Sequence, residues 1–236
     1  MFYPGCLLIS HLIQNNCAVL SFDLDGHGRN STTELSSNNF KNCLSDKWAW
    51  IREEANGRKI FLLGHSLGGT LALSTTLSNA LKVNGVIGIG CPFNLKTPGL
   101  IAMLKEVYQS ISPEFFTNLS YFSPKTLLPA IGRFKRDEFP IRLDRSFHPH
   151  ENYVEVVQKV ICELTPRSHT LSHTPILLIL GAQDSIAPPT NALKWLDFYR
   201  GGEYLILQRT THFLLAFRQK TATQIIGWIN KEARKT

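Results

Sequence analysis

The stretch Gly64-His65-Ser66-Leu67-Gly68-Gly69 directly follows the apolar run 60–63 and precedes a run of small and apolar residues, 70–74. This order is typical of a nucleophile elbow, the sharp strand-to-helix turn that exposes a serine at the end of a strand. Gly64 and Gly68 lack a Cβ, and we expect this to let the chain pass close to its neighbours. The pattern predicts a strand over 59–63, a turn at Ser66 and a helix to about Lys82.

Two later apolar runs end in residues that match this serine chemically. Residues 175–180 predict a buried strand, and Asp184 follows shortly after its end. Residues 203–207 predict another strand, which is followed by His212. In the fold that carries a nucleophile elbow, the partners come in the order serine, acid, histidine, each on a loop after a strand. We therefore interpret Ser66, Asp184 and His212 as a candidate catalytic triad.

The roles of these residues follow from their chemistry. A serine hydroxyl becomes an effective nucleophile when a base takes its proton, and we expect His212 to be that base and later the acid. Asp184 would hold the imidazole in the right tautomer and stabilise its cation. The backbone N–H of Leu67, at the N-terminus of the predicted helix, would help to stabilise an oxyanion.

Each of these residues also has a purely structural alternative. Ser66 fits an ordinary strand-to-helix turn, Asp184 fits the cap of a turn before two prolines, and His212 fits a plain loop histidine. His65 lies inside the elbow, and we expect its side chain to pack or to hydrogen-bond. The histidines that compete with His212 lie in an irregular region with no strand before them: His148, His150, His169 and His173.

Together these motifs resemble the α/β-hydrolases of the lysophospholipase, monoacylglycerol lipase and serine-aminopeptidase-like branch. Residues 23–31 are similar to the family's D-x-x-G-H-G-x-S loop, with one extra residue before Ser31, and residues 181–184 with Pro188 match a later motif. The resemblance spans residues 17–212. It implies an α/β fold, with a mostly parallel sheet, helices on both faces and a helical cap insertion. It also implies a serine hydrolase, most often an esterase or lipase, without a metal or organic cofactor.

One family feature is missing near the start of the sequence. Members usually carry an H-G dipeptide on a strand well upstream of the D-x-x-G-H-G loop, and the loop after it supplies a second oxyanion N–H. Here the D-x-x-G-H-G loop already begins at Asp23. Residues 5–16 before it predict only the helix that precedes a strand at 17–22. We therefore expect an N-terminally truncated fold that lacks its first strands and the second donor. A catalytically impaired homologue that acts as a binding protein is accordingly an alternative.

The remaining elements follow from the spacing of apolar residues. We expect a strand over 85–90 and helices over 39–56, 190–199 and 221–231. Strands that are apolar throughout and alternate with helices favour a parallel sheet covered on both faces. We expect a single domain over 1–236, with a core at 1–92 and 174–236 and a cap at about 93–173. Apolar segments of the cap would form a pocket for acyl chains or pack the cap onto the body.

Composition limits the cellular setting and the partners. Five cysteines without C-x-x-C spacing favour a reducing compartment, which we take as cytoplasmic, and argue against a disulfide framework or a zinc site. No apolar run reaches transmembrane length. A signal peptide carries a basic residue before its apolar run, and the apolar run near the N-terminus has none before it. The net charge of +7 fits either a solvated surface or peripheral contact with anionic membranes. Nucleic-acid binding is not expected, because no recognition motif is present.

The function expected from these features is hydrolysis of a carboxylic ester. The substrate would be a small-molecule or lipid-like acyl ester, cleaved through an acyl-enzyme on Ser66. Amide or peptide hydrolysis and acyl transfer stay open, because the same residues serve the same chemistry in all three. The sequence leaves the oligomeric state open.

Overall fold

A computed structural model describes residues 6–26, 35–93, 153–165, 171–184, 186–210, 212 and 219–235. Within these ranges, four parallel strands form one sheet: β1 (Phe61–His65), β2 (Gly85–Ile89), β3 (Ile176–Gly181) and β4 (Glu203–Leu207). The strands lie side by side in chain order. Because they are parallel, their carboxyl ends meet at one edge of the sheet, and the loops that follow them lie together there.

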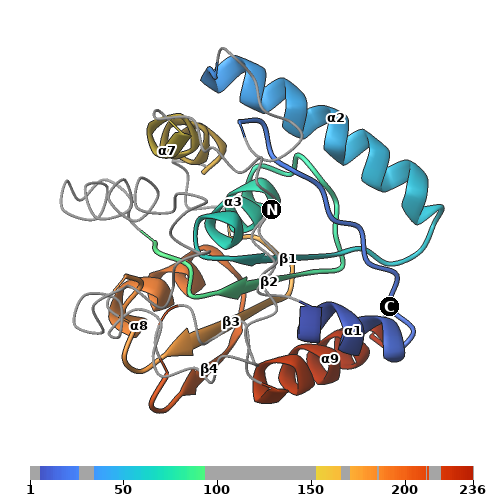
Figure 1. The fold of residues 1–236 in the computed structure, drawn as a ribbon, viewed down its shortest axis with the longest axis vertical. Coiled ribbons are helices and arrows are strands. Elements are labelled where there is room, and N and C mark those ends of the chain that lie inside the picture. Colours follow the sequence, from blue (N-terminus) through green and yellow to red (C-terminus); the bar gives the residue numbers. More distant parts are fainter. Residues whose placement is uncertain are drawn as a thin grey trace, which may run out of the picture.

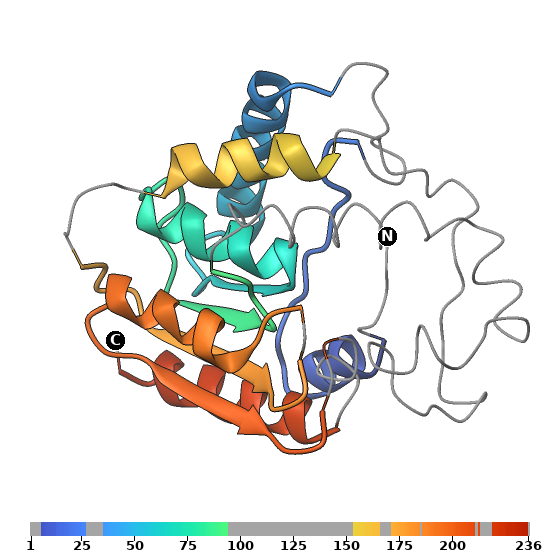
Figure 2. The same ribbon diagram turned by 90° about the vertical axis from the view of Figure 1, so that its left-hand side faces the viewer.

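Helices cover both faces of this sheet, as the resemblance implied (Figure 1). On one face lie α1 (Cys6–Gln14) and α9 (Gln219–Ala233). On the other lie α3 (Leu67–Leu77), α8 (Pro189–Ala192) and the 3₁₀ helix η2 (Leu193–Phe198). Two further helices, α2 (Ser37–Ala55) and α7 (Tyr153–Leu164), pack over α3 on its outer side (Figure 2). The chain therefore has the α/β-hydrolase fold class that the sequence predicts.

Alternating side chains of β3 supply both halves of the core. Ile176, Leu178 and Leu180 pack beneath α3 and η2, whereas Leu177 and Ile179 pack against α1 and α9. All five are buried, because successive side chains of a strand point to opposite faces and both faces are covered here. This explains why the strand is apolar throughout rather than alternating.

The helix that the sequence predicts over 39–56 is confirmed as α2. Its N-cap is Ser36, whose side-chain oxygen accepts a hydrogen bond from the backbone N–H of Asn39 at 3.2 Å. It ends at Asn56, which adopts the left-handed conformation with φ of 45°. Its buried side chains recur at helical spacing and face α3 and α7: Phe40, Leu44, Trp48 and Ile51.

The predicted strand over 17–22 is wrong. Cys17 and Val19 pack into the core beside α1 and α9, and Phe22 and Leu24 pack into the core beside α2. Within the described residues, however, this segment forms no strand and no ladder pairs it with β1. Apolar side chains predict burial, but a strand also requires backbone pairing in register with a neighbour.

Two predicted helices differ in form. The one expected over 190–199 is a single α turn, α8, that tightens into η2. Trp195 and Phe198 are three residues apart and share one face of η2, as the 3₁₀ geometry requires. The elbow helix, α3, ends at Leu77 rather than near Lys82, because Asn79 adopts a left-handed conformation with φ of 56°.

Most of the predicted cap lies outside the described residues, as do residues 27–31 of the loop that resembles D-x-x-G-H-G-x-S. Within the range predicted for the cap, α7 packs against α2 and α3 through Val157, Val160 and Ile161. The division into core and cap stays a prediction.

Near the C-terminus, two lysines form ion pairs: Lys231 with Glu203 at 2.7 Å and Lys235 with Glu232 at 2.6 Å. Among the described helices, none is both long and apolar enough to cross a bilayer.

Candidate active site

Ser66 lies between β1 and α3 in a strained backbone conformation, with φ of 53° and ψ of −126°. A positive φ is costly for a residue with a Cβ, so the surrounding structure must hold it. Its N–H donates to the carbonyl of Ile89 at the end of β2 (2.8 Å), and its carbonyl accepts from the N–H of Thr70 in α3 (3.0 Å). The sheet and the helix thus fix this strand-to-helix turn from both sides.

Two glycines make the turn possible, but only one of them is among the two that the sequence predicts. A Cβ on Gly64 would lie 2.5 Å from backbone atoms of Gly68 and Gly69, so this position accepts only glycine. A Cβ on Gly69 would collide with the Cys91 sulfur and lie 2.6 Å from the Gly64 carbonyl oxygen. At Gly68, by contrast, a Cβ would meet nothing within 4 Å. The expectation for Gly64 is confirmed, whereas the second close approach is at Gly69 and not at Gly68.

Asp184 and His212 meet at the same edge of the sheet. The Nδ1 atom of His212 lies 2.8 Å from Oδ2 of Asp184, and both side chains are almost completely buried. The other carboxylate oxygen, Oδ1, accepts hydrogen bonds from the backbone N–H groups of Ile186 (2.9 Å) and Ala187 (2.7 Å). Asp184 therefore caps its turn, as the structural alternative had it, and also contacts His212.

The loops that carry these two residues are joined directly. The N–H of Gln183 donates to the carbonyl of Thr210 at 3.0 Å, and Thr210 is fully buried. A Cβ on Gly181, the last residue of β3, would collide with that same carbonyl. Close contact between the ends of β3 and β4 therefore brings His212 within reach of Asp184.

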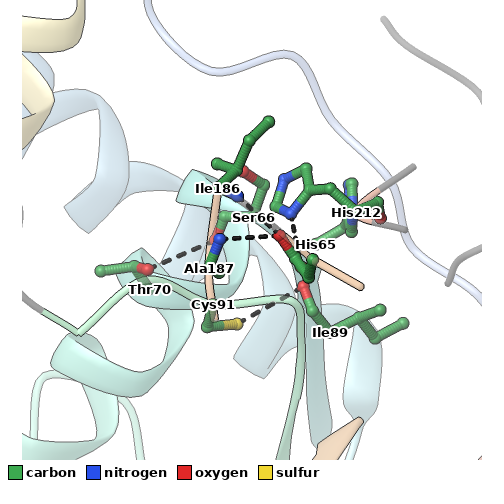
Figure 3. A network of polar contacts seen from close by, with 9 residues as sticks. His65, Ser66, Thr70, Ile89, Cys91, Ile186, Ala187 and His212 are labelled. Atoms are coloured by element: carbon green, nitrogen blue, oxygen red, sulfur yellow. Dashed lines mark hydrogen bonds and ion pairs between the residues drawn. The ribbon is translucent and has the colours of Figure 1, made fainter. Parts of the chain in front are cut away.

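His65 connects the elbow to this pair (Figure 3). Its Nε2 atom lies 3.0 Å from the backbone carbonyl oxygen of His212, and the two imidazole rings are 4.8 Å apart, tilted by 41°. Because Ser66 follows His65 in the chain, the serine lies at the same strand end as the buried pair. The structure thus brings together the strand ends that carry all three predicted triad residues.

Leu67, predicted as the oxyanion donor, is the first residue of α3. Its side chain is buried in the core shared with α2 and α7. The first N–H groups of a helix have no acceptor within the helix, so the backbone N–H of Leu67 is available for a bond outside it. Leu67 thus lies directly beside Ser66, and its role as the oxyanion donor stays a prediction.

Sequence reasoning missed two residues under the elbow. Cys91, just after β2, is fully buried, and its pKa is raised by this burial and by the charge of Asp184. Its thiol therefore stays protonated and is no competing nucleophile. Thr70 places its hydroxyl 2.9 Å from the carbonyl oxygen of Pro92 and 3.3 Å from that of Ser66. No local pattern signals the bond from Thr70 to Pro92, because it joins residues 22 positions apart.

Comparisons with known proteins agree with this fold. A family model described as serine aminopeptidase, S33, matches residues 6–203. Monoacylglycerol lipase from Paleococcus ferrophilus is similar in structure, with a TM-score of 0.66 and 21% identity over 96% of this chain and 88% of that one. A soluble variant of monoglyceride lipase from Saccharomyces cerevisiae gives a TM-score of 0.68 and 18% identity over 97% and 80%.

MenH from S. aureus is similar as well, with a TM-score of 0.69 and 17% identity over 97% of this chain and 90% of that one. At such identities the likeness concerns the fold. No curated protein sequence matches the chain.

Proposed function

Because this chain belongs to the serine aminopeptidase S33 family of α/β-hydrolases, we propose that it is a serine hydrolase with Ser66, His212 and Asp184 as its triad. The observation that carries the proposal is the buried contact between His212 and Asp184 at the sheet edge where the strained Ser66 lies. A carboxylate bound to Nδ1 orients the imidazole so that Nε2 can accept a proton. A strained serine at a strand-to-helix turn is the partner that such a base needs.

The proposed reaction runs in two halves. As His212 takes the proton of the Ser66 hydroxyl, the serine oxygen attacks the acyl carbon. The negative charge that develops on the carbonyl oxygen is stabilised by the N–H of Leu67 at the N-terminus of α3. The imidazolium, held by Asp184, then protonates the leaving alcohol, and an acyl-enzyme remains. Water, activated by the same histidine, releases the acid and restores Ser66.

Esters are the proposed substrates, in particular acyl esters of lipid-like or short chains. Support comes from two monoacylglycerol lipases that share the fold over nearly the whole chain, and from the apolar residues predicted in the cap. The description of the family favours a second candidate, cleavage of an amide bond at a peptide N-terminus. Both reactions use the same nucleophile, base and oxyanion donor, so substrates must separate them.

A paired substrate assay tests this proposal. Wild type, Ser66→Ala and Ser45→Ala are assayed on p-nitrophenyl acetate, p-nitrophenyl decanoate and alanyl-p-nitroanilide. Ser45 is an exposed serine on α2 and serves as the matched control. We expect ester turnover in the wild type and in Ser45→Ala and none above background in Ser66→Ala.

Turnover of the anilide alone would favour the peptidase, whereas absence of turnover in a folded wild type would favour the non-catalytic binding protein.

The cellular location is a separate proposal. The four cysteines whose side chains the structure describes are free thiols, which is compatible with the reducing cytoplasm proposed from the sequence.

A further inference from the structure

The contact between His65 and His212 has a defined direction. A carbonyl oxygen only accepts hydrogen bonds, so the 3.0 Å contact with the His212 carbonyl requires a proton on Nε2 of His65. The carbonyl belongs to the residue whose own ring contacts Asp184. His212 is thus held at two points, by Asp184 through its ring and by His65 through its backbone.

The same strand end holds the serine. His65 is the last residue of β1, and Ser66 is fixed through its N–H to the Ile89 carbonyl at 2.8 Å. A shift of β1 would therefore move the nucleophile and the anchor of the base together. The contact therefore ties His212 to the strand end that carries Ser66, and an error of about 1 Å in the placement of reacting groups can slow a reaction roughly 100-fold.

The charge state of His65 suits this role. Loss of hydration around the ring and the nearby His212 lower the pKa of His65 to about 3, although its bond to the His212 carbonyl opposes this shift. His65 is then a neutral donor near pH 7. A second cation 4.8 Å from the His212 ring would oppose the imidazolium that forms there during the reaction.

We propose that His65 is a positioning residue, which fixes the backbone of the catalytic base by donating its Nε2 hydrogen to the His212 carbonyl. The inference rests on the proposed function, because it takes His212 as the base. It assigns to the residue before the nucleophile a task that the triad itself does not include.

Two variants of His65 and one control test this proposal. His65→Gln keeps an N–H donor near the place of Nε2, whereas His65→Phe keeps a flat ring without a donor. His173→Gln is the control, since His173 is exposed and lies away from the elbow in sequence. Each protein is melted to establish that it folds, labelled with a fluorophosphonate to measure the rate at Ser66, and examined by NMR for the Nδ1 proton of His212.

We expect His65→Phe to label about 10- to 100-fold more slowly than wild type and to lose or shift the His212 Nδ1 proton signal. His65→Gln should recover most of the labelling rate and of the signal, and His173→Gln should match wild type in both. Nitrogen-15 spectra of the wild type should show His65 protonated on Nε2 alone at pH 7.

A folded His65→Phe protein with the labelling rate and proton signal of wild type would overturn the inference, as would an Nδ1-protonated tautomer of His65. If the wild type is folded but does not label, the proposed function fails. The inference is then judged by the two NMR readouts, which do not require activity.

Discussion

The two oxygens of Asp184 have different partners: Oδ2 contacts Nδ1 of His212 at 2.8 Å, and Oδ1 accepts from the N–H groups of Ile186 and Ala187. One oxygen orients the imidazole, and the other holds the loop after β3 in shape. Substitutions of this residue should therefore separate its effect on activity from its effect on stability.

Asp184→Asn should abolish most activity without unfolding the chain. The amide oxygen can still accept from Ile186 and Ala187, but the amide NH₂ would then face Nδ1 of His212. His212 would adopt the tautomer that carries its proton on Nε2, which cannot accept the proton of Ser66. We expect a loss of about 10⁴-fold in kcat, by analogy with the same change in a serine protease triad. Asp197→Asn, at an exposed aspartate of η2, is the control and should keep wild-type kcat.

Asp184→Ala should destabilise the fold as well. It removes the acceptor of two backbone N–H groups whose residues, Ile186 and Ala187, are buried. Each unsatisfied group costs about 1–3 kcal/mol, so the free energy of unfolding in urea should fall by more than in Asp184→Asn. Equal stability of the two variants would show that Oδ1 does not hold this loop.

The elbow glycines offer a matched pair of substitutions. Gly64→Ala places a methyl group 2.5 Å from backbone atoms that cannot move aside, and we expect a loss of about 3 kcal/mol or more in unfolding free energy. Gly68→Ala meets nothing within 4 Å and lies in α3, so it should gain about 0.5–1 kcal/mol. Thermal and urea unfolding measure both. A destabilised Gly68→Ala, or a stable Gly64→Ala, would contradict the packing of the turn.

The lowered pKa of His65 predicts that acid destabilises the protein. The folded chain keeps His65 neutral down to about pH 3, whereas the unfolded chain binds a proton near its ordinary pKa of about 6.5. Between these values the unfolded state holds one more proton, so stability falls as the pH falls, by up to about 1.4 kcal/mol per unit. Unfolding free energies at pH 7 and pH 5 should differ less in His65→Gln than in wild type. An equal difference in both proteins would be the contrary result.

A buried hydroxyl away from the triad provides a structural comparison. Tyr199 places its hydroxyl 2.7 Å from Oγ1 of Thr76 and donates to the carbonyl of Leu73 at 3.0 Å. Tyr199→Phe should lower the unfolding free energy by about 1 kcal/mol and leave the labelling rate of Ser66 unchanged. Tyr204→Phe, at an exposed tyrosine of β4, should change neither quantity. Slower labelling of Ser66 in Tyr199→Phe would mean that this hydrogen-bond network affects the active site.

The sequence predicts the elbow and the sheet well because their signals are local. Runs rich in apolar residues mark β1 to β4, and residues 64–69 mark the strand-to-helix turn at Ser66. The places of Asp184 and His212 after strands predict that they lie together, since the carboxyl ends of parallel strands share one edge, and the two side chains are in contact.

Contacts between distant segments were beyond sequence reasoning. The anchor between His65 and His212 joins residues 147 positions apart, and no periodicity reports such a pair. The segment 17–22 is apolar in the manner of a strand, yet backbone pairing depends on a neighbour that its own sequence does not specify. The tightening of α8 into η2 likewise reflects packing of Trp195 in the core rather than helical preference.

Fluorophosphonate labelling of the purified chain, followed by peptide mass spectrometry, tests the central claim most directly. The account predicts that the probe is found on Ser66, that Ser66→Ala is not labelled and that His212→Ala is labelled far more slowly. A folded wild type that takes up no probe would contradict an activated serine at this elbow. Labelling of His212→Ala as fast as that of wild type would contradict it as well.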